Sequence, residues 1–116
     1  MSIQKEVYSE RILQMSEGHP EFLRILKEIE DLHRKKSADY GVADDIFLNI
    51  RQSSDWGVKP WVGAMVRAGD KVVRLKAAAS GSKLKNEGVE DSLIDLAAYA
   101  MIALALYREG KSNDTD

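Results

Sequence analysis

The chain contains no cysteine among its 116 residues, and only two histidines. The lack of cysteine excludes disulfide scaffolds, cysteine-built zinc sites, iron–sulfur clusters and thiol catalysis. His19 and His33 alone are too few for a histidine-built zinc site. Neither sign of charge predominates, because the chain has 17 Lys and Arg and 19 Asp and Glu, a net charge of −2. We therefore expect neither a nucleic acid nor a membrane as a partner.

Long hydrophobic runs are absent as well. The first 14 residues, MSIQKEVYSERILQ, are charged every few positions and lack the apolar core of a signal peptide. The uninterrupted apolar run from Leu96 to Tyr107 is shorter than the roughly 18 to 20 residues that cross a bilayer. We expect a cytoplasmic protein.

Proline and glycine are sparse, and the stretches between them are rich in good helix formers. The sequence predicts an all-α fold, a small helical bundle of four to five helices that forms one domain over residues 1–110. The charged residues 111–116 are predicted to be a disordered tail. A chain of this length buries a modest core, so we also expect it to associate with copies of itself.

Spacing of apolar residues and helix start signals place the predicted helices. Pro20 and Pro60 each suit the first turn of a helix. In the predicted helix from Trp61 to about Ala79, Gly63 and Gly69 each lower helix stability by about 1 kcal/mol relative to alanine. We expect that they permit close contact with another helix. The predicted helices cover Ile3 to about Met15, Pro20 to about Lys36, a short segment from Asp44 through Ile50, Trp61 to about Ala79, and Val89 to about Arg108.

Asp95 is the anomaly of the last predicted helix, because the segment from Ser92 to Tyr107 is apolar almost all round and only Ser92 and Asp95 in it are clearly polar. Such a helix is expected to be buried on most sides, and a carboxylate there needs a partner. Glu87 and Asp91 precede it at one-turn intervals, so the three acids follow one stripe. Mg²⁺ or Mn²⁺ bound by Glu87, Asp91 and Asp95 would remove their mutual repulsion. Alternatively, Asp95 pairs with an Arg or Lys while the other acids favour the helix N-terminus.

Two further groups of charged residues have both a functional and a structural interpretation. Asp70 and Arg74 are one turn apart and could form an intrahelical pair. In the functional interpretation Asp70 joins the metal ligands, and Lys71 and Arg74 neutralise phosphate oxygens. Lys36 stands at a helix C-terminus, where the helix dipole already favours a cation, and it could equally bind phosphate.

Aromatic and amide side chains lie between these groups in the sequence. Trp56 and Trp61 flank a short turn, and either ring could stack a nucleobase or fill the core. Asn49 could read the edge of a base or sugar.

Four motifs together resemble a known family. Lys36-x-x-Asp39-Tyr40-Gly41, Phe47-x-Asn49, Asp70-Lys71-x-x-Arg74-Leu75 and Glu87-x-x-x-Asp91-x-x-x-Asp95-Leu96-Ala97-x-Tyr99-Ala100 are similar to the phage and bacterial nucleotide-modification-associated family, which is related to the MazG-like all-α nucleoside triphosphate pyrophosphatases. The likeness spans about Lys35 to Ala103. It implies a Mg²⁺-dependent homodimer or homotetramer of bacterial or phage origin that acts in the cytoplasm and binds a (deoxy)nucleotide.

The resemblance predicts a nucleoside triphosphate pyrophosphohydrolase that releases a nucleoside monophosphate and pyrophosphate. The predicted catalytic residues are Asp91, Asp95 and Lys71, and the predicted metal ligands are Glu87, Asp91, Asp95 and Asp70. The predicted substrate-binding residues are Lys36, Asp39, Tyr40, Asn49, Arg74 and Trp61. Two other hypotheses stay open: a non-catalytic nucleotide-binding or sponge protein, and a structural helical oligomer in which Asp95 is a buried polar group that sets register.

Overall fold

The computed structural model describes residues 17–39, 47–84 and 87–113, and these residues form helices and no strand, which confirms the predicted all-α class. The chain divides into two compact units, Met1–Gly41 and Val42–Asp116. The first predicted helix, Tyr40 and the predicted start of the short helical segment at Asp44 lie outside the described residues. No described helix is both long enough and apolar enough to span a membrane.

In the first unit, helix α2 covers Pro20–Asp39 and begins where the sequence predicts. The backbone N–H of Glu21 donates to Nδ1 of His19 at 3.2 Å, so His19 satisfies one of the free amides of the first turn. Along its surface, α2 carries ion pairs such as Lys27–Asp31, with Nζ and Oδ1 at 3.1 Å. Pairs this exposed add little stability individually.

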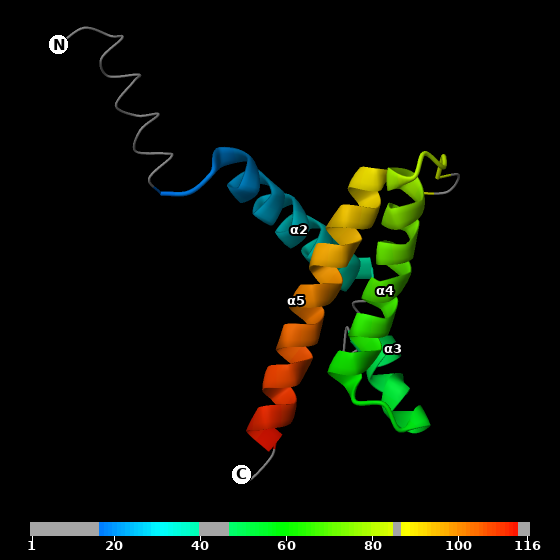
Figure 1. The fold of residues 1–116 in the computed structure, drawn as a ribbon. Helices are drawn as coiled ribbons and strands as arrows, with labels where there is room; N and C mark the ends of the chain where they lie inside the picture. The colour runs from blue at the N-terminus through cyan, green and yellow to red at the C-terminus, as the bar shows by residue number, and fades with distance from the viewer. Residues whose placement is uncertain (1–16, 40–46, 85–86, 114–116) are drawn as a thin grey trace, which may run out of the picture. The chain divides into compact units, whose positions relative to one another are not determined.

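The second unit is built on two long helices, α4 (Pro60–Ala79) and α5 (Val89–Asn113), which lie side by side and run in opposite directions (Figure 1). A short helix α3 (Leu48–Arg51) continues into the 3-10 helix η1 (Gln52–Trp56), and both pack on α4. The left-handed Gly57, with φ of 78°, ends η1 and turns the chain toward Pro60.

The core of the second unit is small. Ile50 from α3, Ala64 from α4, and Ala103 and Leu106 from α5 form its buried cluster. Alanine at the contact lets the two long helices approach closely. Where α5 ends, Glu109 accepts hydrogen bonds from Arg51 at 2.6 and 3.0 Å, which ties α3 to α5.

Helix α5 differs from its prediction in two respects. It continues to Asn113, so Lys111 and the two residues after it are helical rather than part of a tail. It is also less buried than expected, because Leu93, Met101 and Leu104 remain about half exposed. Within the described second unit, its extensive packing is with α4 alone.

Of the two glycines inside α4, only Gly63 lies at a close contact. A Cβ built on Gly63 would stand 2.7 Å from Cβ of Ser53 in η1, whereas a Cβ on Gly69 meets nothing within 4 Å. The expectation of close approach therefore holds at Gly63 and not at Gly69.

We predict that Gly63→Ala lowers stability and Gly69→Ala raises it. The first substitution forces η1 away from α4, at a cost of about 1 to 3 kcal/mol. The second removes backbone freedom from the unfolded chain at an open helical position, a gain of about 0.5 to 1 kcal/mol. Thermal unfolding followed by circular dichroism measures both changes. Equal effects of the two substitutions would contradict the close contact between Gly63 and Ser53.

Candidate functional site

Charged side chains from α4 meet side chains at the start of α5 in a group that we call the polar cluster: Lys71, Arg74, Glu87, Ser92 and Asp95. The cluster forms because α4 and α5 are antiparallel and joined by a short connection, which brings the middle of α4 beside the first turns of α5.

Lys71 is the centre of the polar cluster. Its Nζ donates to Oε1 and Oε2 of Glu87 at 2.9 and 3.0 Å and lies 2.9 Å from Oδ2 of Asp95. The side chains of Lys71 and Glu87 are each 18% exposed, and that of Asp95 is 28% exposed. Both carboxylates therefore converge on a single cation in a partly desolvated space.

Glu87 has two further partners. Nε of Arg74 lies 3.3 Å from Oε2 of Glu87, and the Ser92 hydroxyl donates to the same oxygen at 3.0 Å. Ser92 is fully buried, and its backbone N–H donates to the carbonyl of Gly88 at 3.0 Å. The two positive and two negative charges of the cluster balance, so none of them is buried without compensation.

These contacts shift the acidity of the central pair. Hydrogen bonds from Lys71 lower the pKa of the Glu87 carboxyl from 4.5 to about 2, and the hydrogen bond from Ser92 acts in the same direction, against the opposing effect of burial. Hydrogen bonds to Glu87 and then to Asp95 raise the pKa of the Lys71 ammonium, against the opposing effect of burial. Glu87 is thus ionised and Lys71 protonated at neutral pH.

The structure brings together four of the predicted site residues, Lys71, Arg74, Glu87 and Asp95, and not the full set of acids. Asp70 and Asp91 are exposed, and no described ion pair links either of them to the cluster. In the described part of the chain, no three carboxylate or histidine side chains form a group that could hold a metal ion. The partner of Asp95 is Lys71, as the alternative interpretation of this carboxylate expected.

Other predicted substrate-binding residues lie elsewhere. Lys36 and Asp39 belong to the last turn of α2, in the first unit. Trp61 packs edge-on against Tyr107, with ring centroids 5.7 Å apart and an interplanar angle of 89°. This contact gives Trp61 a core role at the junction of α4 and α5.

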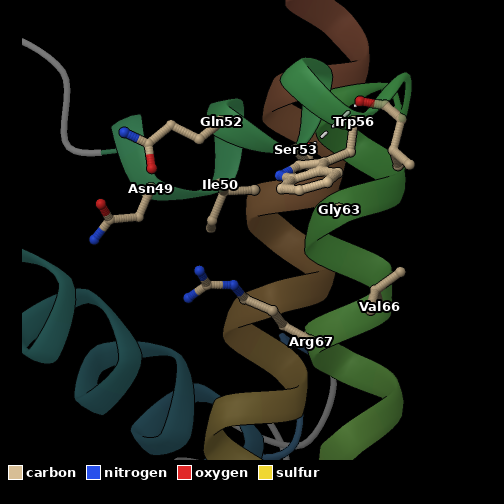
Figure 2. Close-up of a pocket in the computed structure, with 9 residues that line it drawn as sticks. Asn49, Ile50, Gln52, Ser53, Trp56, Gly63, Val66 and Arg67 are labelled. Carbon is tan, nitrogen blue, oxygen red and sulfur yellow. Dashed lines mark hydrogen bonds between the residues drawn. The ribbon is translucent and has the colours of Figure 1, made fainter.

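Asn49 lines a pocket of about 380 Å³ where α3 and η1 meet α4 (Figure 2). Trp56, which is 87% exposed, and Arg67 line the same pocket. Figure 2 shows the Arg67 guanidinium extending from α4 toward the side on which the Asn49 amide lies. Arg67 and Lys71 are four residues apart, so the pocket and the polar cluster lie one helical turn apart on one face of α4.

Sequence reasoning missed Ser92 and Arg67 as members of these sites. Ser92 was the one clearly polar residue besides Asp95 in an apolar segment, which was the signal for a buried hydroxyl. Arg67 stands four residues before Lys71 and seven before Arg74, which was the signal for a row of cations along one helix face.

Compared with models of known protein families, with curated proteins and with solved structures, the chain matches none.

We predict that Glu87→Gln reduces the loss of stability in acid. Because the pKa of Glu87 is lowered from 4.5 to about 2 by folding, its ionised form contributes stability that is complete above about pH 4.5 and disappears as the pH falls toward 2. The melting temperature of the unmodified chain should therefore fall more steeply over this range than that of Glu87→Gln. Melting curves recorded in EDTA between neutral pH and pH 3 make the comparison.

Asp91→Asn is the matched control for this measurement, because Asp91 is an exposed carboxylate from the same region of the chain. Its acid profile should follow that of the unmodified chain. Parallel profiles for Glu87→Gln and the unmodified chain would show that the contacts of Glu87 do not stabilise the fold.

Proposed function

We propose that the chain is a metal-dependent (deoxy)nucleoside triphosphate pyrophosphohydrolase whose polar cluster receives the triphosphate. One observation carries the proposal: two carboxylates and two cations, all partly exposed, converge from facing helices onto one small space. A Mg²⁺–triphosphate complex likewise holds positive and negative charges close together, as the polar cluster does.

Charge exchange supports binding of such a complex. In the free chain Glu87 and Asp95 are neutralised by Lys71, and Arg74 adds a second contact to Glu87. When a metal–phosphate complex binds, the carboxylates can turn to the cation while Lys71 and Arg74 turn to phosphate oxygens. The two carboxylates then face the two positive charges of the metal, and Lys71 and Arg74 each face phosphate oxygens, so no charged side chain of the cluster loses its partner.

The donor set suits Mg²⁺ or Mn²⁺. Glu87 and Asp95 already direct carboxylate oxygens at one cation, the Lys71 ammonium, from 2.9 Å. Two carboxylates plus substrate phosphates and water are a usual environment for Mg²⁺. When bound there, the ion supplies neutralisation of phosphate charge.

The pocket beside the cluster supports a nucleotide rather than a bare polyphosphate. Trp56 presents an exposed indole face on which a base can stack, and the Asn49 amide can donate and accept at a base edge. Arg67 stands between this pocket and Lys71 along α4, in line with a phosphate chain that leads from one to the other.

In the proposed reaction a water oxygen bonds to the α-phosphorus, and the bond from that phosphorus to the oxygen bridging the α and β positions breaks. Pyrophosphate leaves with the bridging oxygen, and the water gives up a proton. Asp95 is the proposed acceptor of that proton, as a partly exposed carboxylate of the cluster. Lys71 and Arg74 stabilise charge on the departing phosphates. The scheme does not depend on the other predicted site residues, whose participation stays a prediction: Asp70, Asp91, Lys36, Asp39 and Tyr40.

We predict that the chain releases pyrophosphate from at least one of the eight common nucleoside triphosphates in Mg²⁺ or Mn²⁺. Asp95→Asn and Lys71→Gln should each lower the rate by about a hundredfold or more, because each removes a group that is charged in the reaction. Coupled release of pyrophosphate, followed with and without EDTA, is the measurement. No release from any of the eight with either metal would reject the proposal.

Lys76→Gln is the control for loss of a cation from α4, since Lys76 is exposed and lies on a different face from Lys71. It should retain activity. Thermal stabilisation by nucleotide that is unchanged by EDTA, with the nucleotide recovered intact, would instead indicate a non-catalytic nucleotide-binding protein.

A structural role is the second candidate, and the complete charge balance of the polar cluster favours it. Lys71 joins Glu87 and Asp95 across two helices, which is also what a cluster that only fixes the register of α4 against α5 would do. In that case neither metal nor nucleotide stabilises the chain, and Asp95→Leu is neutral or stabilising.

A further inference from the structure

A second pocket lies at the end of the second unit away from the polar cluster, where the start of α4 and the end of α5 (green and red in Figure 1) line it. Its volume of about 410 Å³ is within the usual range of small-molecule sites, about 300 to 1,000 Å³. We call this cavity, which is lined among others by Lys59, Trp61 and Lys111, the end pocket. It shares no lining residue with the pocket of Figure 2, and Pro60 at its edge lies about three turns of α4 before Lys71.

Two aromatic rings form the apolar wall of the end pocket. Trp61 from α4 and Tyr107 from α5 meet edge-on, with ring centroids 5.7 Å apart and an interplanar angle of 89°. Trp61 is half-buried and Tyr107 is 43% exposed, so part of each ring is open to a ligand. Perpendicular rings make a corner in which a flat group can stack on one ring while it meets the edge of the other.

Cations predominate around this wall. Lys59 and Lys111 line the end pocket, and neither forms an ion pair with a residue in the described part of the chain. Nζ of Lys111 stands 5.7 Å from the centre of the Tyr107 ring, which places the ammonium beside the aromatic wall. Among the described lining residues Glu109 is the one acid, and Arg51 neutralises it through hydrogen bonds of 2.6 and 3.0 Å. Two ammonium groups therefore remain uncompensated here, although the net charge of the chain is −2.

From this combination we infer that the end pocket binds a small aromatic anion, a flat ring that carries a carboxylate or phosphate group. The ring stacks against Trp61 or Tyr107. Lys59 and Lys111 line the same cavity, and their long flexible side chains can turn to one anionic group. An anion without a ring gains only exposed lysines, which bind weakly, and a neutral ring leaves both ammonium groups without a partner.

The inference does not rest on the proposed hydrolysis, because no residue of the polar cluster lines the end pocket. The two tryptophans of the chain make the two pockets separately observable, since Trp56 lines the pocket of Figure 2 and Trp61 lines the end pocket. The indole N–H signals in a ¹⁵N NMR spectrum therefore report which pocket a ligand enters. Trp56→Phe assigns the two signals and leaves the fold intact, because Trp56 is 87% exposed.

The test titrates the full ¹⁵N-labelled chain with phenyl phosphate and, separately, with benzoate. At least one of these anions should shift the Trp61 indole signal saturably. Lys59→Gln and Lys111→Gln should each weaken this binding about threefold, and the double substitution about tenfold, since each removes one exposed charge contact. Lys76→Gln, which removes an exposed cation from another part of α4, is the matched control and should leave the affinity unchanged.

Inorganic phosphate and benzyl alcohol test the two halves of the ligand. Each should bind at least about tenfold more weakly than the better aromatic anion, because it lacks either the ring or the charge. The inference would be overturned by no saturable shift of the Trp61 signal with either aromatic anion, by a shift confined to Trp56, or by binding that the double lysine substitution leaves unchanged. Equal affinity for inorganic phosphate would overturn the aromatic contact, and equal affinity for benzyl alcohol the anionic one. None of these results depends on whether the chain hydrolyses a nucleotide.

Discussion

The ammonium group of Lys71, held between the carboxylates of Glu87 and Asp95, is the interaction on which the second unit depends. Without it two acids would face each other in a partly desolvated space, and their repulsion would oppose the contact between the start of α5 and the middle of α4. Ser92 and Arg74 complete the arrangement by filling the remaining acceptor positions of Glu87. The same contacts thus hold the start of α5 against α4 and compensate the charges of the polar cluster.

A cluster so fully compensated is consistent with a structural or a substrate-binding role, and its partial exposure favours the second. A purely structural ion network gains from burial of all its members with their hydrogen bonds satisfied. Here Arg74 is 34% exposed and Asp95 28%, so both can exchange partners without the chain unfolding. The neighbouring pocket, lined by Trp56 and Arg67, lies along α4 from the cluster, so a nucleotide bound at both places would extend along this helix. These two observations are why we place nucleotide hydrolysis first among the proposals.

Local signals in the sequence were enough for the helices and insufficient for the site. Pro20, Pro60 and the periodicity of apolar residues located α2, α4 and α5, because helix formation is decided within a few turns. The one-turn spacing of Glu87, Asp91 and Asp95 suggested a common site, but whether such acids meet depends on what packs against them. Glu87 precedes α5 and turns to Lys71, whereas Asp91, within the helix, is exposed. The prediction that the three acids share one helix face assumes that they belong to one continuous helix, whereas α5 begins two residues after Glu87.

The same dependence on what packs against a helix explains why α5 is less buried than its sequence indicates. An apolar run from Leu96 to Tyr107 indicates a helix that is covered on most sides, and periodicity carries no information on whether the cover comes from the same chain or another. In the second unit α4 covers one side, and the opposite side keeps an apolar stripe with an acid at one end and bases at the other. The hydrophobicity of α5 therefore exceeds what its contact with α4 buries.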